Sequence, residues 1–133
     1  MINLVIAPHP DDEVLGLGGT IYKKKMKGEK FGVIYVTSMY PSKLWNKKKI
    51  KERDKEINKV CKFLKFDFVC KLNFPSAKLD QVKRQEIVKK IDNVIKKYKP
   101  ATVFIPNPND AHSDHKVVFE SASSCSKSFR NRF

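Results

Sequence analysis

Two short stretches of the sequence carry side chains of the types that bind metal ions. The first, APHPDDEVLG at positions 7–16, places His9, Asp11 and Asp12 between an apolar run and a glycine. The second, NDAHSDH at positions 109–115, places two histidines three residues apart. Imidazoles together with carboxylates are the ligand set of zinc and related divalent ions. Side by side, the two stretches would form a metal site of the kind that hydrolytic enzymes use.

The ligand number of a catalytic zinc site gives each of these side chains a role. Such a site takes three protein ligands and keeps a position for water, and we expect His9, Asp12 and His115 to supply the three. Zinc is the expected ion, and another divalent metal is compatible with the same ligands. Asp11 is then free to act as general base toward a water molecule whose pKa the ion lowers. His112 is expected to stabilise an oxyanion or to protonate a leaving amine.

The same residues also have simpler structural explanations. Asp11 or Asp12 alone is most simply a helix N-cap. An HxxH pattern occurs by chance on many helices, and a single histidine near a strand end is often a hydrogen-bonded bystander. The metal-site hypothesis therefore depends on a fold that brings the two distant stretches to one place.

Four apolar runs predict the strands that would position these stretches. The first, second and fourth are nearly continuous, which is typical of strands covered on both faces of a sheet. The runs are LVIA at 4–7, FGVIYVT at 31–37, FDFVCKL at 66–72 and ATVFIP at 101–106.

Helical patterns separate the runs. Apolar residues recur at helical spacing from Val14 to Met26, from Ile50 to Leu64 and from Val82 to Tyr98. This alternation predicts an α/β fold, a Rossmann-like three-layer sandwich whose parallel sheet has the strand order 3-2-1-4. The first and fourth strands are neighbours in that order, so the two stretches that follow them would open into one crevice.

The formal net charge of +14 invites a nucleic-acid hypothesis. The charge is nearly all lysine, however, and it is interleaved with acids in stretches such as NKKKIKERDKEINKVCKF. This pattern is typical of a solvated surface, whereas base readout favours arginine. We therefore expect no specific nucleic-acid partner. A basic nucleic-acid-binding module, in which HPDD only caps a helix, is the alternative from a different functional class.

The length and the remaining composition limit the class of protein further. A chain of 133 residues suits one domain, 1–133. The sequence contains no run of eighteen apolar residues, so no transmembrane segment is predicted. Met1 leads into INLVIAP without the basic region of a signal peptide. The three cysteines form no CxxC motif. A cytoplasmic protein fits these features, and a homo-oligomer is compatible with them.

The two stretches resemble the motifs of a known family. APHPDDEVLGLGGT is similar to the AHPDDE signature of the PIG-L or LmbE-like zinc-dependent N-acetylglucosaminyl deacetylases, and NDAHSDH is similar to their HxDH motif. RDKE at 53–56 resembles a weaker RxxE pattern. The resemblance covers residues 2 to about 120 and implies a metal-dependent hydrolase that removes an N-acetyl group from an amino-sugar conjugate.

Matched position by position, the resemblance implies His9, Asp12 and His115 as metal ligands, Asp11 as the base and His112 as the oxyanion stabiliser or acid. The chemistry of the side chains gives the same roles. The resemblance adds Asp114, which would orient a histidine by hydrogen bonding. It also adds Arg53 as a contact to polar groups of the substrate, although a surface ion pair between Arg53 and Glu56 explains that residue equally well.

The sequence departs from the family pattern in two respects. In NFPSAKLD, Ser76 stands where the family commonly has an aspartate. Family members also continue well past the HxDH helix, while here the serine-rich segment 121–133 predicts an irregular tail after an ordered core of about 2–120. A longer family domain cut short would explain this, and an inactive, metal-binding remnant is the alternative to a working deacetylase.

Overall fold

The structure, a computed structural model, describes residues 1–125 of the chain. Within them the strands are β1 (Ile2–Ala7), β2 (Lys30–Ser38), β3 (Phe68–Pro75) and β4 (Thr102–Phe104). The helices are α1 (Asp12–Lys25), α2 (Lys47–Phe63), α3 (Arg84–Tyr98) and α4 (Ser113–Ser124), and a short 3-10 helix, η1 (Leu79–Gln81), precedes α3. Each strand is followed by a helix, as the alternation of apolar runs and helical patterns predicts.

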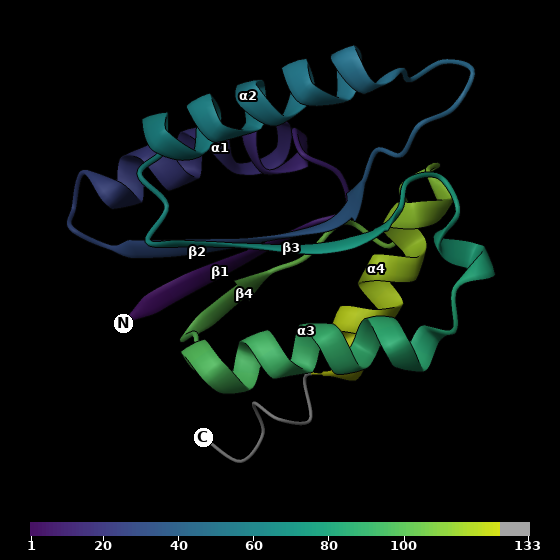
Figure 1. The fold of residues 1–133 in the computed structure, drawn as a ribbon. Coiled ribbons are helices and arrows are strands. Elements are labelled where there is room, and N and C mark those ends of the chain that lie inside the picture. Colours follow the sequence, from purple (N-terminus) through teal and green to yellow (C-terminus); the bar gives the residue numbers. More distant parts are fainter. Residues whose placement is uncertain (126–133) are drawn as a thin grey trace.

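The four strands form one parallel sheet in the order β3-β2-β1-β4, which confirms the predicted strand order. β1 pairs with β2 along its whole length and with β4 through Asn3, Leu4 and Val5. Figure 1 shows α1 and α2 covering one face of the sheet, with α3 and α4 on the other. The carboxyl ends of β1 and β4 therefore lie next to each other at one edge of a three-layer sandwich.

Side chains of β1 alternate between the two helical layers. Leu4 and Ile6 pack in a buried cluster with α3 and α4, whereas Val5 and Ala7 pack with α1 and α2. Burial on both faces explains why this strand reads as a continuous apolar run. The central strand is thus held from both sides, and so is the loop that leaves it.

β4 is shorter and less covered than the apolar run that predicts it. The run at 101–106 predicts a strand buried on both faces, but the strand extends only over Thr102–Phe104, and Thr102 and Ile105 are exposed. The reason is its position, because β4 pairs with β1 alone and lies at the edge of the described sheet. Pro106, which has no backbone N–H to donate, follows directly.

α4 extends beyond the predicted ordered core and corrects the expected start of the irregular tail. The helix continues to Ser124, and Ala122 and Cys125 are buried in the cluster that contains α3. The serines fit in the helix because their hydroxyls bond inside it: Ser121 Oγ donates to the carbonyl of Val117 and Ser124 Oγ to that of Glu120. The rest of the expected tail, 126–133, lies outside the described residues.

Among residues 1–125, every helix is too short or too polar to cross a lipid bilayer.

Candidate metal centre

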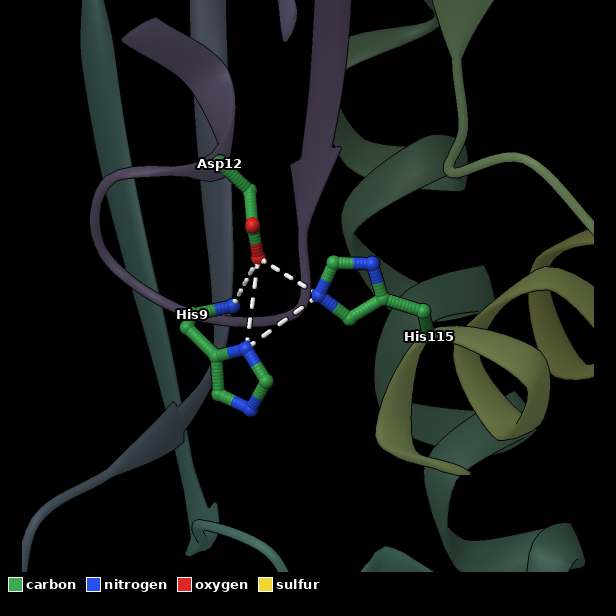
Figure 2. Close-up of side chains that lie close together, drawn as sticks. All are labelled: His9, Asp12 and His115. Carbon is green, nitrogen blue, oxygen red and sulfur yellow. Dashed lines mark hydrogen bonds and ion pairs between the residues drawn. The ribbon is translucent and has the colours of Figure 1, made fainter. Parts of the chain in front are cut away.

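The two predicted stretches meet at the carboxyl ends of β1 and β4. His9 lies in the loop that leaves β1, Asp12 is the first residue of α1, and His115 lies in the first turn of α4. Figure 2 shows the three side chains pointing toward one another from these separate elements. The strand order brings the two histidines together although they are 106 positions apart in the chain.

The three potential ligand atoms form a triangle whose size suits one zinc ion. His9 Nδ1 lies 3.3 Å from Asp12 Oδ2, His115 Nε2 lies 3.2 Å from the same oxygen, and the two nitrogens are 3.3 Å apart. Tetrahedral zinc with bonds of about 2.0–2.1 Å places its ligand atoms about 3.3 Å from one another. The donor set and its spacing therefore both fit zinc.

Two carboxylates orient the histidine rings for this role. Asp114, fully buried on α4, lies 2.8 Å from His9 Nε2, and Asp110 lies 2.9 Å from His115 Nδ1. With a proton on each of these ring nitrogens, His9 Nδ1 and His115 Nε2 keep lone pairs directed at the triangle. Asp114 thus contacts a histidine, and the role that the resemblance implies for it stays a prediction. Asp110, an equivalent partner of the second ring, is a residue that the sequence analysis missed.

The contacts within the triangle shift the pKa values of His9 and Asp12 in opposite directions. Burial lowers the pKa of His9, but hydrogen bonds and charge from Asp12 and Asp114 outweigh burial, so the pKa lies above its usual value. Burial raises the pKa of Asp12, and its hydrogen bonds with His9 bring the pKa below the usual value. A metal ion that binds here therefore competes with protonation of His9.

Neither aspartate of the HPDD stretch caps the helix with its side chain. Asp11 occupies the N-cap position of α1 but makes no side-chain capping bond. Asp12 Oδ2 accepts a hydrogen bond from the backbone N–H of His9 at 2.8 Å. The capping explanation is therefore wrong for both residues.

Asp11 lies beside the triangle rather than in it. Its Oδ2 is 3.3 Å from the Arg53 guanidinium, which also donates to the carbonyl of Pro10 at 2.6 Å. Arg53 is at the same time 3.6 Å from Glu56, so the structure contains the expected ion pair as well. Arg53 thus holds the loop that presents Asp11.

A buried carboxylate underneath the loop is a second residue that the sequence analysis missed. Glu13 is 2% exposed; its Oε1 accepts from the Tyr35 hydroxyl at 2.8 Å and its Oε2 from the N–H of Asp11 at 3.0 Å. Burial raises the pKa of Glu13 despite these two donors. The sequence did contain a signal for this residue, because Glu13 is the third acid of the HPDDE stretch and lies in the first turn of the predicted helix.

His112 begins α4 and lies next to the ligands. Its Nδ1 accepts the N–H of Asp114 at 3.1 Å, which makes it the N-cap. Its ring centroid lies 4.5 Å from that of His9 and 5.2 Å from that of His115. His112 therefore adjoins the candidate metal position with Nε2 free of this capping bond.

Asp11 and His112 both line one open cavity of about 570 Å³ beside His9. Arg53 and Ser76, the residue at the position of the family aspartate, line it as well. Its wall also includes apolar side chains and further polar ones: Met39, Tyr40, Ile50, Ile57, Ser38, Asp54, Lys71 and Asn73. The cavity joins the candidate base, the candidate acid and one candidate ligand in a space that suits a small molecule.

A second set of potential ligands, His9, His112 and Asp114, shares one histidine with the triangle. Asp114 already accepts the backbone N–H groups of Ala77 at 2.7 Å and Leu79 at 3.1 Å. Its oxygens are thus used to hold the chain, and the triangle is the better candidate.

Comparison with known proteins identifies a family and several relatives. Residues 4–126 match the family described as PIG-L: GlcNAc-PI de-N-acetylase. The diacetylchitobiose deacetylase of Thermococcus kodakarensis is 30% identical to the chain, over 85% of the chain and 44% of that protein.

Two solved structures share the fold over nearly all of the chain. The conserved protein TT1542 of Thermus thermophilus has a TM-score of 0.79 at 33% identity, covering 94% of this chain and 55% of that one. The N,N'-diacetylchitobiose deacetylase of Pyrococcus horikoshii has a TM-score of 0.82 at 27% identity, covering 95% and 49%. The chain thus spans about half the length of these relatives.

Proposed function

The chain belongs to the PIG-L family of GlcNAc-PI de-N-acetylases, and from this membership we propose that it is a zinc-dependent N-deacetylase. The substrate is an amino-sugar conjugate of the N-acetylglucosamine type, and the reaction hydrolyses the acetamide to acetate and a free amine. The relatives named for deacetylation of diacetylchitobiose support the substrate class.

His9, Asp12 and His115 would hold the zinc ion, and Asp110 and Asp114 would orient the two histidines. A bound zinc ion would lower the pKa of a water molecule to about 7 and polarise the acetyl carbonyl. The observation that carries the proposal is the triangle of ligand atoms at 3.2–3.3 Å, one of whose residues, His9, also lines a cavity that holds two further acid–base groups.

The chain's own residues carry the proton transfers. Asp11 accepts the proton of the attacking water, because its carboxylate lies at the cavity and takes no part in the triangle. His112, whose Nδ1 accepts the N–H of Asp114, donates a hydrogen bond to the developing oxyanion through Nε2. The proton that Asp11 takes from the water passes to the leaving amine. Arg53 holds Asp11 and binds polar groups of the sugar.

A second candidate function is metal binding without turnover. The triangle of ligand atoms supports this candidate by itself, because metal binding needs no substrate site. In that case zinc binds stoichiometrically to His9, Asp12 and His115 and no amide is cleaved.

Acetate release from N,N'-diacetylchitobiose and from N-acetylglucosamine by the zinc-loaded protein tests the proposal. We expect the protein to release acetate, chelation to abolish this release and added zinc to restore it. The His9→Ala variant should release no acetate. Stoichiometric zinc with no acetate release from either sugar would support the second candidate. Acetate release that persists in His9→Ala would contradict both.

A further inference from the structure

The connection from β2 to α2 and the first turn of α2 expose apolar and basic side chains together. Leu44 is 78% exposed and Tyr40 is 50% exposed, while Trp45 is half-buried. Lys43 precedes Leu44, and three consecutive lysines, 47–49, follow Asn46. We refer to residues 40–49 as the basic–apolar segment.

Two lysines of this segment, Lys47 and Lys48, are not placed where they would stabilise the chain itself, whereas Lys49 Nζ donates to the carbonyl of Leu44 at 3.4 Å. Lys47, Lys48 and Lys49 form the first turn of α2, which has no acidic residue, so their charge opposes the helix dipole. α1 and α3 carry lysines in their last turns, where cations are favourable. Lys47 and Lys48 form no ion pair with another described residue. An anionic partner outside the chain supplies a reason for this charge.

We propose that the basic–apolar segment docks the protein on an anionic lipid membrane. Leu44, Trp45 and Tyr40 match the headgroup region, where tryptophan and tyrosine are favoured and apolar side chains enter the acyl boundary. The lysines match the negative surface potential of such a membrane. A duplex nucleic acid fits less well, since its phosphates leave an exposed leucine without a partner and its specific contacts favour arginine.

Docking through this segment places the cavity at the membrane surface. Tyr40 belongs to the segment and lines the cavity, and Ile50, the next residue of α2, lines it too. The cavity mouth would then face N-acetylated sugars carried on lipids. Only this last step rests on the proposed function; the docking itself does not.

The chain provides its own probe of docking, because Trp45 is its single tryptophan. We expect vesicles of phosphatidylcholine with phosphatidylglycerol to shift Trp45 emission to shorter wavelengths, and brominated lipids to quench it. Vesicles of phosphatidylcholine alone should have a much weaker effect. Unchanged Trp45 emission in the presence of anionic vesicles would overturn the proposal.

Charge variants separate docking from general attraction by the basic protein. Lys47→Glu/Lys48→Glu should weaken vesicle binding about 30-fold or more, and Leu44→Ser about tenfold. Lys55→Glu/Lys59→Glu is the matched control, because both lysines are exposed on later turns of α2 and the net-charge change is the same. Its binding should fall far less, and thermal melting checks that each variant folds.

Two results would contradict the proposal. Equal loss in the control and the Lys47/Lys48 variant would mean attraction by net charge alone. Tighter binding of duplex DNA than of anionic vesicles, with the same sensitivity to Lys47 and Lys48, would mean a nucleic-acid interface. Vesicle binding is measured without substrate, so its failure leaves the deacetylase proposal untouched, and inactivity on soluble sugars leaves docking untouched.

Discussion

Asp11 and Asp12 are neighbours in the chain, yet their carboxylates lie in different surroundings. Asp12 Oδ2 lies among the ring nitrogens of His9 and His115, whereas Asp11 Oδ2 lies by the guanidinium of Arg53. The backbone at Asp11, with φ of 151° and ψ of −25°, turns the two apart. That conformation is rare for a residue other than glycine and persists only when its surroundings hold it.

The division between the two aspartates predicts the behaviour of Asp11→Asn. The amide cannot accept a proton, so kcat should fall by about 10²–10⁴, the range for a lost acid–base group. Zinc content should stay at the parent level, because the triangle does not include Asp11. Steady-state kinetics and metal analysis of the same preparation measure both.

Asp80→Asn is the matched control, since Asp80 is exposed on η1 and lies outside the cavity. It should have parent kinetics. Near-normal turnover of Asp11→Asn would assign the base to another residue, and loss of its zinc would place Asp11 among the ligands.

Tyr35→Phe tests the buried contact that supports the loop. Without the hydroxyl, the Glu13 carboxylate loses one of its two described donors in a buried position. The free energy of unfolding should fall by about 1.5–3 kcal/mol, as for a lost hydrogen bond to a charged group. We also expect kcat to fall more than KM changes, because the Asp11 backbone is less firmly held.

Tyr22→Phe is the control for this change, since Tyr22 is 58% exposed. Denaturant unfolding of both variants measures the difference. Equal stability of the two would show that the Tyr35–Glu13 hydrogen bond contributes nothing measurable.

Zinc affinity should depend on pH in a defined direction. The pKa of His9 is raised above 6.5 in the metal-free protein, so protonated imidazole competes with zinc below and just above that pH. Apparent affinity should therefore rise as pH increases through the window just above 6.5 and level off once His9 is neutral. Calorimetric titrations in two buffers of different ionisation enthalpy measure affinity and proton release together. Affinity that does not vary with pH, or binding without proton release in this window, would contradict a raised pKa of His9.

At the scale of elements, the pairing of β2 with β3 depends on one glycine. A Cβ atom at Gly32 would lie 2.1 Å from the Phe68 ring, and that ring also stacks on Tyr98 of α3 with centroids 3.6 Å apart. Gly32→Ala should therefore destabilise the protein by about 1–3 kcal/mol through overpacking.

Gly19→Ala is the matched substitution on α1. Gly19 is exposed within the helix, and a Cβ there meets no atom within 4 Å. It should stabilise the protein by about 0.5–1 kcal/mol, because alanine favours the helix. Urea unfolding should show a lower free energy of unfolding for Gly32→Ala and a higher one for Gly19→Ala. A change in the same direction for both variants would contradict this account.

The elements themselves were largely predictable, and the exceptions have physical reasons. Continuous apolar runs indicated β1 and β2 because both strands are buried on two faces. The end of α4 was not predictable, because a serine-rich stretch is typical of a loop. In the folded helix the serine hydroxyls donate to carbonyls four residues earlier. The Tyr35–Glu13 contact was not predictable either, because it joins residues 22 positions apart and needs the sheet to place Tyr35 under the loop.

At the scale of the whole molecule, the candidate site exists only once the sheet has formed. His9 follows the central strand and His115 follows the edge strand, so their convergence was predictable from the strand order alone. The orientation of each ring was not, because it depends on carboxylates placed by the folded loops, Asp110 for one ring and Asp114 for the other. Zinc binding should accordingly stabilise the folded protein as a whole.

X-ray absorption at the zinc edge, measured on protein loaded with zinc and freed of excess metal, tests the central claim most directly. We predict one zinc ion per chain with nitrogen and oxygen ligands at about 2.0–2.1 Å, including two imidazoles. The signal should be lost in His9→Ala and in His115→Ala and kept in Asp11→Asn. Absence of stoichiometric zinc, a sulfur shell at about 2.3 Å, or zinc retained in His115→Ala would contradict it.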